Sequence, residues 1–270
     1  MEHQLVELNM NEQFEKQIQE TIPKIKDKLH ILHFSTGADS VACYLRLKEW
    51  GIKPILIYDY FLPHIPMVDN YIDYFEKKFN VKVYKLPSKL YAQHIDNALY
   101  QCPVKSRENF RNEITTYELW KWDSNRLRKK ILQELGLKKE QVVFHKGIRY
   151  TDGQLRYISI KKNGVYHKDG SFFPIASFKI SDIQNILRKY GCKLPIEYKL
   201  WGISLEAPRS WNIGLIRENC PVSYKYICEY FPMIKLLEHR DRFNKLNQHF
   251  KIRLAQFAEF AMEKDLYKVW

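Results

Sequence analysis

The sequence lacks several features that define common classes of protein. It has no apolar run approaching the ~18 residues of a membrane-spanning helix, so we expect no membrane segment. Its first residues, MEHQLVELNMNEQF, have neither the basic start nor the apolar core of a secretory signal, which favours a cytoplasmic location. Glycine and proline number only 10 and 11 in 270 residues, which argues against a low-complexity or disordered chain.

Cysteine is also scarce. The chain has five, and no two of them form a CxxC pair: Cys43, Cys102, Cys192, Cys220 and Cys228. An odd number without paired spacing argues against a disulfide framework and against a four-cysteine zinc or iron–sulfur site. The pattern fits a reducing compartment.

Acidic residues are too few to balance the basic ones. The chain has 44 Lys and Arg against 31 Asp and Glu, a formal net charge of +13. This excess favours an anionic partner, which can be a nucleotide, a nucleic acid or an anionic surface. A basic surface that only aids solubility explains the same charge. Nucleic acid and protein partners therefore stay open.

Buried-strand and helical patterns alternate along the chain. Strands are predicted at 28–34, 53–60, 81–87 and 141–149. Helices are predicted at 4–26, 40–50, 67–79, 123–137 and 181–191, and the chain beyond 223 is mainly helical. The alternation of strand and helix is typical of a parallel sheet with crossover helices.

Turn and capping residues place the ends of these elements. Gly51, Gly136 and Gly191 are expected to stop the helices that precede them, and Ser181 is expected to cap the helix that follows it. The segment NGVYHKDGSFFPI, residues 163–175, carries two turn signals and predicts a hairpin or an exposed loop.

The loop STGADS, residues 35–40, joins the first predicted strand to the next helix. Ligands of open parallel sheets bind at the carboxyl ends of strands, and a helix N-terminus attracts anions. Gly37 allows a close backbone approach and a positive φ, and the hydroxyl groups can donate to phosphate. Asp39 would cap the helix or orient a metal. The loop therefore predicts a phosphate site; a simple strand–turn–helix capped by Asp39 or Ser40 is the alternative.

The same loop resembles the SGGxDS pyrophosphate loop (PP-loop) of the adenine-nucleotide α-hydrolases, or N-type ATP pyrophosphatases, with Thr36 in place of a glycine. Three later segments are similar to the phosphoadenosine phosphosulfate (PAPS) reductase family. They are KGIRYTDGQLR (146–156), FPIASFKISDIQNILRKYGCKLPIEYKLW (173–201) and ENCPVSYKYICEYFP (218–232). Together these matches span about 35–235 of the chain.

The resemblance implies a fold, a ligand and a set of site residues. The fold is α/β and adenine-nucleotide α-hydrolase-like (HUP, Rossmann-like), a parallel sheet flanked by helices with a largely helical C-terminal part. The expected parts are an N-terminal helix (1–27), a nucleotide-binding α/β domain (28–205) and a C-terminal helical extension (206–270). The expected ligands are ATP and Mg²⁺. The residues implied in nucleotide binding are Ser35, Thr36, Gly37, Ala38, Asp39, Ser40, Asp59, Gly147, Arg149 and Arg156, with Asp39 and Ser40 catalytic.

Three functions are compatible with this resemblance. The first is an enzyme that cleaves ATP between the α- and β-phosphates, transfers AMP and releases pyrophosphate, in sulfur or nucleic acid modification. The second is a sulfonucleotide reductase, which the lack of a cysteine after Cys228 opposes. The third is a non-catalytic nucleotide sensor or a nucleic-acid-binding module. Cys220 is the candidate nucleophile; its alternative is a small buried residue.

Overall fold

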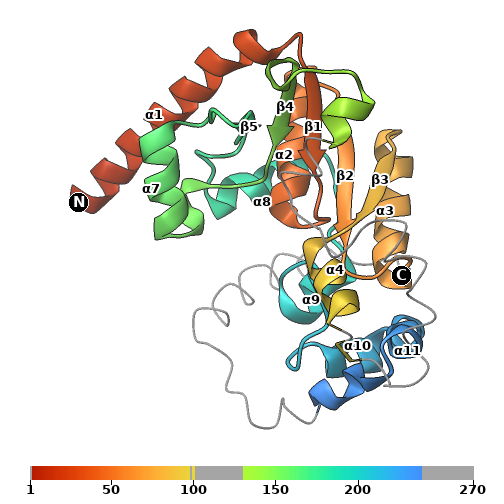
Figure 1. The fold of residues 1–270 in the computed structure, drawn as a ribbon. Helices are drawn as coiled ribbons and strands as arrows, with labels where there is room; N and C mark the ends of the chain where they lie inside the picture. The colour runs from red at the N-terminus through yellow and green to blue at the C-terminus, as the bar shows by residue number, and fades with distance from the viewer. Residues whose placement is uncertain (1, 98, 101–129, 239–270) are drawn as a thin grey trace. The chain divides into compact units, whose positions relative to one another are not determined.

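The computed structural model describes residues 2–97, 99–100 and 130–238 of the chain. A five-stranded, all-parallel sheet flanked by helices runs through them (Figure 1). Its strands are β1 (Leu29–His33), β2 (Ile55–Tyr60), β3 (Val83–Pro87), β4 (Val142–His145) and β5 (Ser171–Phe172). Their order across the sheet is β3-β2-β1-β4-β5. The chain is therefore an α/β protein with a Rossmann-like sheet.

The two central strands are buried because helices cover a parallel sheet on both of its faces. In β1 the pairs Ile31–Ile55 and Leu29–Val142 set the register toward β2 and β4. All four residues of β4 are buried, as are the three middle residues of β1. This explains why both strands read in the sequence as short, nearly continuous apolar runs.

The described helices include those predicted at 4–26, 40–50, 67–79 and 181–191, together with helices at 154–163, 196–201 and 213–219 that the sequence analysis did not predict. In chain order they are α1 (Glu2–Ile25), α2 (Ala38–Glu49), α3 (Pro66–Phe79), α4 (Lys89–Asp96), α7 (Gln154–Asn163), α8 (Ile180–Lys189), α9 (Ile196–Trp201), α10 (Ile213–Asn219) and α11 (Pro221–Tyr230). Short 3-10 turns are η2 (Lys139–Gln141), η3 (Tyr150–Asp152) and η4 (Pro232–Leu236). Gly51, Gly136 and Gly191 have φ of 72°, 63° and 53° after their helices, which confirms the predicted stops. None of the described helices combines the length and apolar character that crossing a membrane requires.

Three local expectations need correction or lie partly outside the described residues. Ser181 does not cap α8: the cap is Lys179, whose backbone N–H donates to the Asp182 carboxylate at 2.7 Å. The segment 163–175 is not an exposed loop, because Ser171–Phe172 pairs with β4 and the run 170–177 is buried. It keeps a hairpin-like antiparallel bridge between Tyr166 and Phe172. Of the predicted helix 123–137, residues 130–134 are described and are helical.

The chain divides into two compact units that interleave along the sequence. The described residues of the first unit are 2–58, 82–84 and 132–193, and those of the second are 59–81, 85–97, 99–100, 130–131 and 194–238. Helix α1 belongs to the first unit, where Phe14, Ile18 and Ile25 pack in one core with Val143 and Phe172. The predicted domain boundaries at residues 27 and 205 stay predictions.

A histidine pair links the two central strands in the first unit. His30 Nδ1 lies 2.8 Å from His145 Nε2, and the rings stack with their centroids 5.0 Å apart. Burial lowers the pKa of both rings, and their mutual repulsion lowers the pKa of His145 further. The pair is therefore neutral, with one ring donating a proton to the other, and acid weakens it.

The second unit contains a buried acid in α9. The Glu197 side chain is inaccessible to solvent, and this burial raises its pKa from 4.5 to about 7. The nearby backbone N–H groups of Glu197 and Leu205 lower the pKa and offset the effect of burial only in part. The folded protein therefore holds a proton on Glu197 at pH values where the unfolded chain has lost it.

This difference predicts a loss of stability as the pH rises from 4.5 through 7. The contribution of Glu197 to the free energy of unfolding should fall by roughly 3 kcal/mol over that range. Glu197→Gln should remove this loss, so that urea unfolding at pH 5, 6, 7 and 8 shows the variant gaining on the wild type as the pH rises. The control is Glu140→Gln, at an exposed position. A stability difference independent of pH would contradict the expectation.

Candidate functional site

The candidate site lies at the topological switch point of the sheet, between β1 and β4, where the order of successive strands reverses. After β1 the chain proceeds to β2 on one side of the sheet, and after β4 it proceeds to β5 on the other. Two central strands that diverge in this way leave a crevice at their carboxyl ends, which is where open α/β sheets bind ligands. The loop 35–40 follows β1 and the segment 146–149 follows β4. The topology therefore brings the two predicted segments to the same edge.

The two segments meet at Gly147. A Cβ atom on Gly147 would lie 2.8 Å from both the carbonyl carbon and the carbonyl oxygen of Asp39, and 2.9 Å from the backbone nitrogen of Ser40. These are backbone atoms that cannot move away as a flexible side chain can. Only glycine therefore allows this approach between the segment after β4 and the first turn of α2.

The loop itself is closed by Ser40. Its hydroxyl donates to the Gly37 carbonyl at 2.8 Å and accepts the Ser35 backbone N–H at 3.2 Å. Gly37 is the N-cap residue of α2, and no side chain caps the helix there. The alternative in which Asp39 or Ser40 caps α2 is therefore wrong. The first turn of α2 starts at Ala38, so the positive end of the helix dipole lies at this edge of the sheet.

The left-handed residue of the loop is Thr36 and not Gly37. Gly37 has φ −71°, whereas Thr36 has φ 61°. A β-branched residue is strained in that region, and the surrounding structure has to hold it there. Thr36 is almost fully buried, and its hydroxyl donates to the Ser35 carbonyl at 2.6 Å. Such strain is concentrated at binding and active sites, where a loop is held in one preorganised shape.

A chain of four charged side chains adjoins the loop. Arg149 Nε lies 3.1 Å from Asp39 Oδ1, and Arg149 Nη2 lies 2.7 Å from Asp152 Oδ1. Asp152 Oδ2 also accepts Arg156 Nη1 at 3.0 Å and the Arg149 backbone N–H at 2.9 Å. The side chains of Arg149 and Asp152 are only 4% and 1% exposed. Together the four side chains carry no net charge, and the two carboxylates fix the guanidinium of Arg149.

Sequence reasoning left Asp152 out of the site, although Asp152 binds both predicted arginines. The signal was present, because Asp152 stands three residues after Arg149 and four before Arg156. Asp39 does not cap α2 and is ion-paired with Arg149; its predicted role in orienting a metal stays a prediction. Among the described residues, no three His, Cys, Asp or Glu side chains converge as a metal site would require.

The two remaining candidates lie in the second unit. Asp59 is exposed in β2, and its part in nucleotide binding stays a prediction. Cys220 stands between α10 and α11, where burial, with a smaller contribution from the charge of Glu197, raises the pKa of its thiol to about 11. The thiolate that a nucleophile requires is therefore disfavoured at neutral pH.

Comparison with known proteins identifies no family for this arrangement. A scan against protein-family models gives no match, and a search of curated proteins gives none either. What the fold and the geometry define is a class: an α/β protein with a Rossmann-like parallel sheet whose central loops meet at its switch point.

The contact at Gly147 predicts the effect of one added methyl group. Gly147→Ala should lower the free energy of unfolding by about 1–3 kcal/mol, because the new Cβ forces the two segments apart. The control is Gly214→Ala in α10, where a Cβ meets nothing within 4 Å and the higher helix propensity of alanine applies. Urea unfolding of the two variants measures both effects. Equal stabilities for them would contradict the close approach at Gly147.

Proposed function

We propose that this chain is an adenine-nucleotide-binding enzyme similar to the PAPS reductase family, with an adenine-nucleotide α-hydrolase-like (HUP) fold and a PP-loop at residues 35–40. It would bind ATP, cleave it between the α- and β-phosphates, transfer the adenylyl group and release pyrophosphate. One observation carries the proposal: a preorganised loop at the N-terminus of α2 lies at the switch point of the sheet, against Gly147.

Each loop residue has a physical task in this proposal. The backbone N–H groups of the first turn of α2 would bind the phosphates to be released, because their dipoles favour an anion. Ser40 would hold the loop in shape through Ser35 and Gly37. Thr36 and Gly37 are buried, which helps to hold the loop in one shape. Catalysis would come from positioning and from stabilising charge on the leaving pyrophosphate.

Arg149 would act through Asp39. The Asp39 carboxylate lies in the first turn of α2, where its negative charge opposes the binding of phosphate. Arg149 neutralises that charge, and Asp152 keeps the guanidinium in place. Arg156, which is half exposed, is the arginine of this group that is open to a ligand. Gly147 completes the site by letting the backbone after β4 approach the loop.

Mg²⁺ fits this site as a companion of the nucleotide and not as a resident ion. The described residues have no group of three converging metal ligands. Mg²⁺ bound with nucleotides commonly takes its ligands from phosphates, water and one or two carboxylates, for which Asp39 is the candidate beside the loop. When bound, the ion would neutralise phosphate charge.

The acceptor of the adenylyl group is proposed to be anionic, with nucleic acid as the leading class. The net charge of +13 supports this, because an excess of basic side chains attracts polyanions. The sulfonucleotide reductase reaction is less well supported, because the raised thiol pKa of Cys220 opposes nucleophilic attack. A nucleotide sensor would use the same loop without turnover.

Calorimetric titration with ATP and Mg²⁺ tests the proposal directly. We expect ATP to bind more tightly than AMP, because the loop holds the phosphates that AMP lacks. Ser40→Ala should weaken ATP about tenfold through the loss of its hydrogen bonds. The control is Ser181→Ala, at an exposed position in α8.

A pyrophosphate-release assay with nucleic acid then separates an enzyme from a sensor. Tighter binding of PAPS would favour the reductase, and no binding of ATP, pyrophosphate or PAPS would refute the site.

A double substitution tests the role given to Arg149. Arg149→Met should weaken ATP binding about tenfold or more, because it leaves the charge of Asp39 uncompensated beside the phosphates. Adding Asp39→Asn should restore most of the affinity. If Arg149 instead contacts the phosphates directly, the second substitution restores nothing. Circular dichroism on each variant confirms that the protein is folded at the temperature of the titration.

A further inference from the structure

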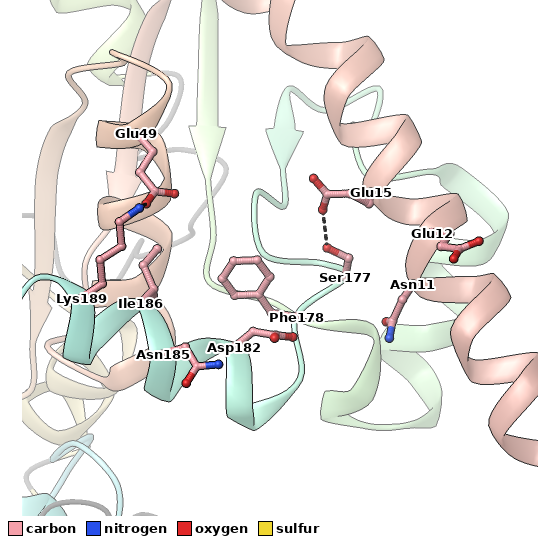
Figure 2. Close-up of a pocket in the computed structure, with 10 residues that line it drawn as sticks. All are labelled: Asn11, Glu12, Glu15, Glu49, Ser177, Phe178, Asp182, Asn185, Ile186 and Lys189. Atoms are coloured by element: carbon pink, nitrogen blue, oxygen red, sulfur yellow. Dashed lines mark hydrogen bonds and ion pairs between the residues drawn. The ribbon is translucent and has the colours of Figure 1, made fainter.

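A cavity lies in the first unit, away from the candidate site, and none of the residues that line it comes from the loops after β1 and β4. It opens between α1, the last residue of α2 and α8, and its volume is about 610 Å³ (Figure 2). Phe178 and Ile186 supply its apolar surface, and polar side chains surround them (Figure 2). Small-molecule sites in proteins measure roughly 300–1,000 Å³, so the cavity is the size of a site for a small ligand.

The cavity keeps an excess of negative charge. Four carboxylates line it: Glu12, Glu15, Glu49 and Asp182. Glu49 is paired with Lys189 at 2.5 Å, and Glu15 is paired with Arg46. Neither Glu12 nor Asp182 has a lysine or arginine within ion-pair distance among the residues that the structure describes. Two carboxylates of the cavity therefore have no basic side chain as a partner, although Asp182 accepts the Lys179 backbone N–H, in a chain whose overall charge is +13.

The spacing of these charges excludes a compact metal ion as the ligand. No three acidic, His or Cys side chains of the described residues come close enough together to hold a metal, and this includes the cavity. Glu12 projects from α1 and Asp182 from α8, and Phe178 lies beside Asp182 on the α8 side of the cavity (Figure 2). A ligand that reaches both carboxylates has to carry separated positive charges on an extended chain.

Two further features fit such a ligand. Phe178 already serves as a cation platform, because the Arg46 guanidinium lies 4.4 Å from its ring centroid. Methylene groups would pack on Phe178 and Ile186. On the α1 wall, Asn11 Oδ1 is buried and accepts no hydrogen bond within the described part of the chain. A buried acceptor of this kind is costly to leave unpaired, and an ammonium N–H would satisfy it.

We propose that this cavity binds a linear aliphatic polyamine. Its terminal ammonium groups would pair with Glu12 and Asp182, and its methylene chain would cross Phe178. The cavity volume of about 610 Å³ lies within the range of small-molecule sites, which favours a small molecule as the ligand. This site does not depend on the proposed nucleotide chemistry, since it shares no residue with it.

Calorimetric titration of the full chain with spermidine, at fixed ionic strength, tests the proposal. We expect spermidine to bind at least ~10-fold more tightly than butylamine, which carries one charge. The double variant Glu12→Gln with Asp182→Asn should lose about tenfold in affinity. Asparagine at 182 keeps an acceptor for the Lys179 N–H, so the cap of α8 is retained.

The matched control removes two charges elsewhere. Glu20→Gln with Glu140→Gln alters two exposed carboxylates that do not line the cavity, and should change spermidine affinity less than ~2-fold. An equal loss in both double variants would reduce the effect to general electrostatics and overturn the site. So would absent binding, or equal affinity for spermidine and butylamine. A lysine-rich peptide that binds more tightly than spermidine, with the same dependence on Glu12 and Asp182, would make the surface a protein-docking site instead.

Discussion

The backbone contact between Gly147 and the first turn of α2 is the constraint on which the candidate site depends. The pairing of β1 with β4 brings the two segments to one edge, and the missing side chain of Gly147 lets them touch. Arg149 follows two residues later and can therefore reach Asp39. A wider separation of the segments would break the ion pair between Arg149 and Asp39 and leave Arg149 paired with Asp152 alone.

Much of the fold was predictable because burial leaves a plain pattern in the sequence. Parallel strands covered on both faces read as short apolar runs, and the helix between β1 and β2 ends just before Gly51. The errors lie where tertiary packing overrides a local signal. The turn residues of 163–175 were read correctly as turns, but pairing with β4 buries the segment. At α8, Asp182 satisfies the helix start that Ser181 was expected to cap.

The residues of the candidate site were predictable from the sequence, but the contacts that join them were not. The loop 35–40, Gly147 and Arg149 come from local sequence, since each depends on residue types next to one another. The ion pair of Asp39 with Arg149 joins segments far apart in the chain, so no local pattern contains it. The positive φ of Thr36 was also hidden, because a β-branched residue is a poor guess for that conformation next to a glycine. Nucleotide binding, catalysis and the role of Asp59 stay predictions.

The balanced charges around Arg149 have a consequence for how salt would affect the binding of different anions to the protein. Two acids and two bases cancel there, so the attraction for phosphate would come from the fixed backbone dipoles of the first turn of α2. Dissolved salt screens such an environment weakly, whereas it competes strongly for exposed lysines and arginines. The affinity for a nucleotide would then depend little on ionic strength. The affinity for a polyanionic acceptor would fall steeply as ionic strength rises. Under the proposed function, a change in salt concentration alone would release a polyanionic acceptor while the nucleotide stays bound.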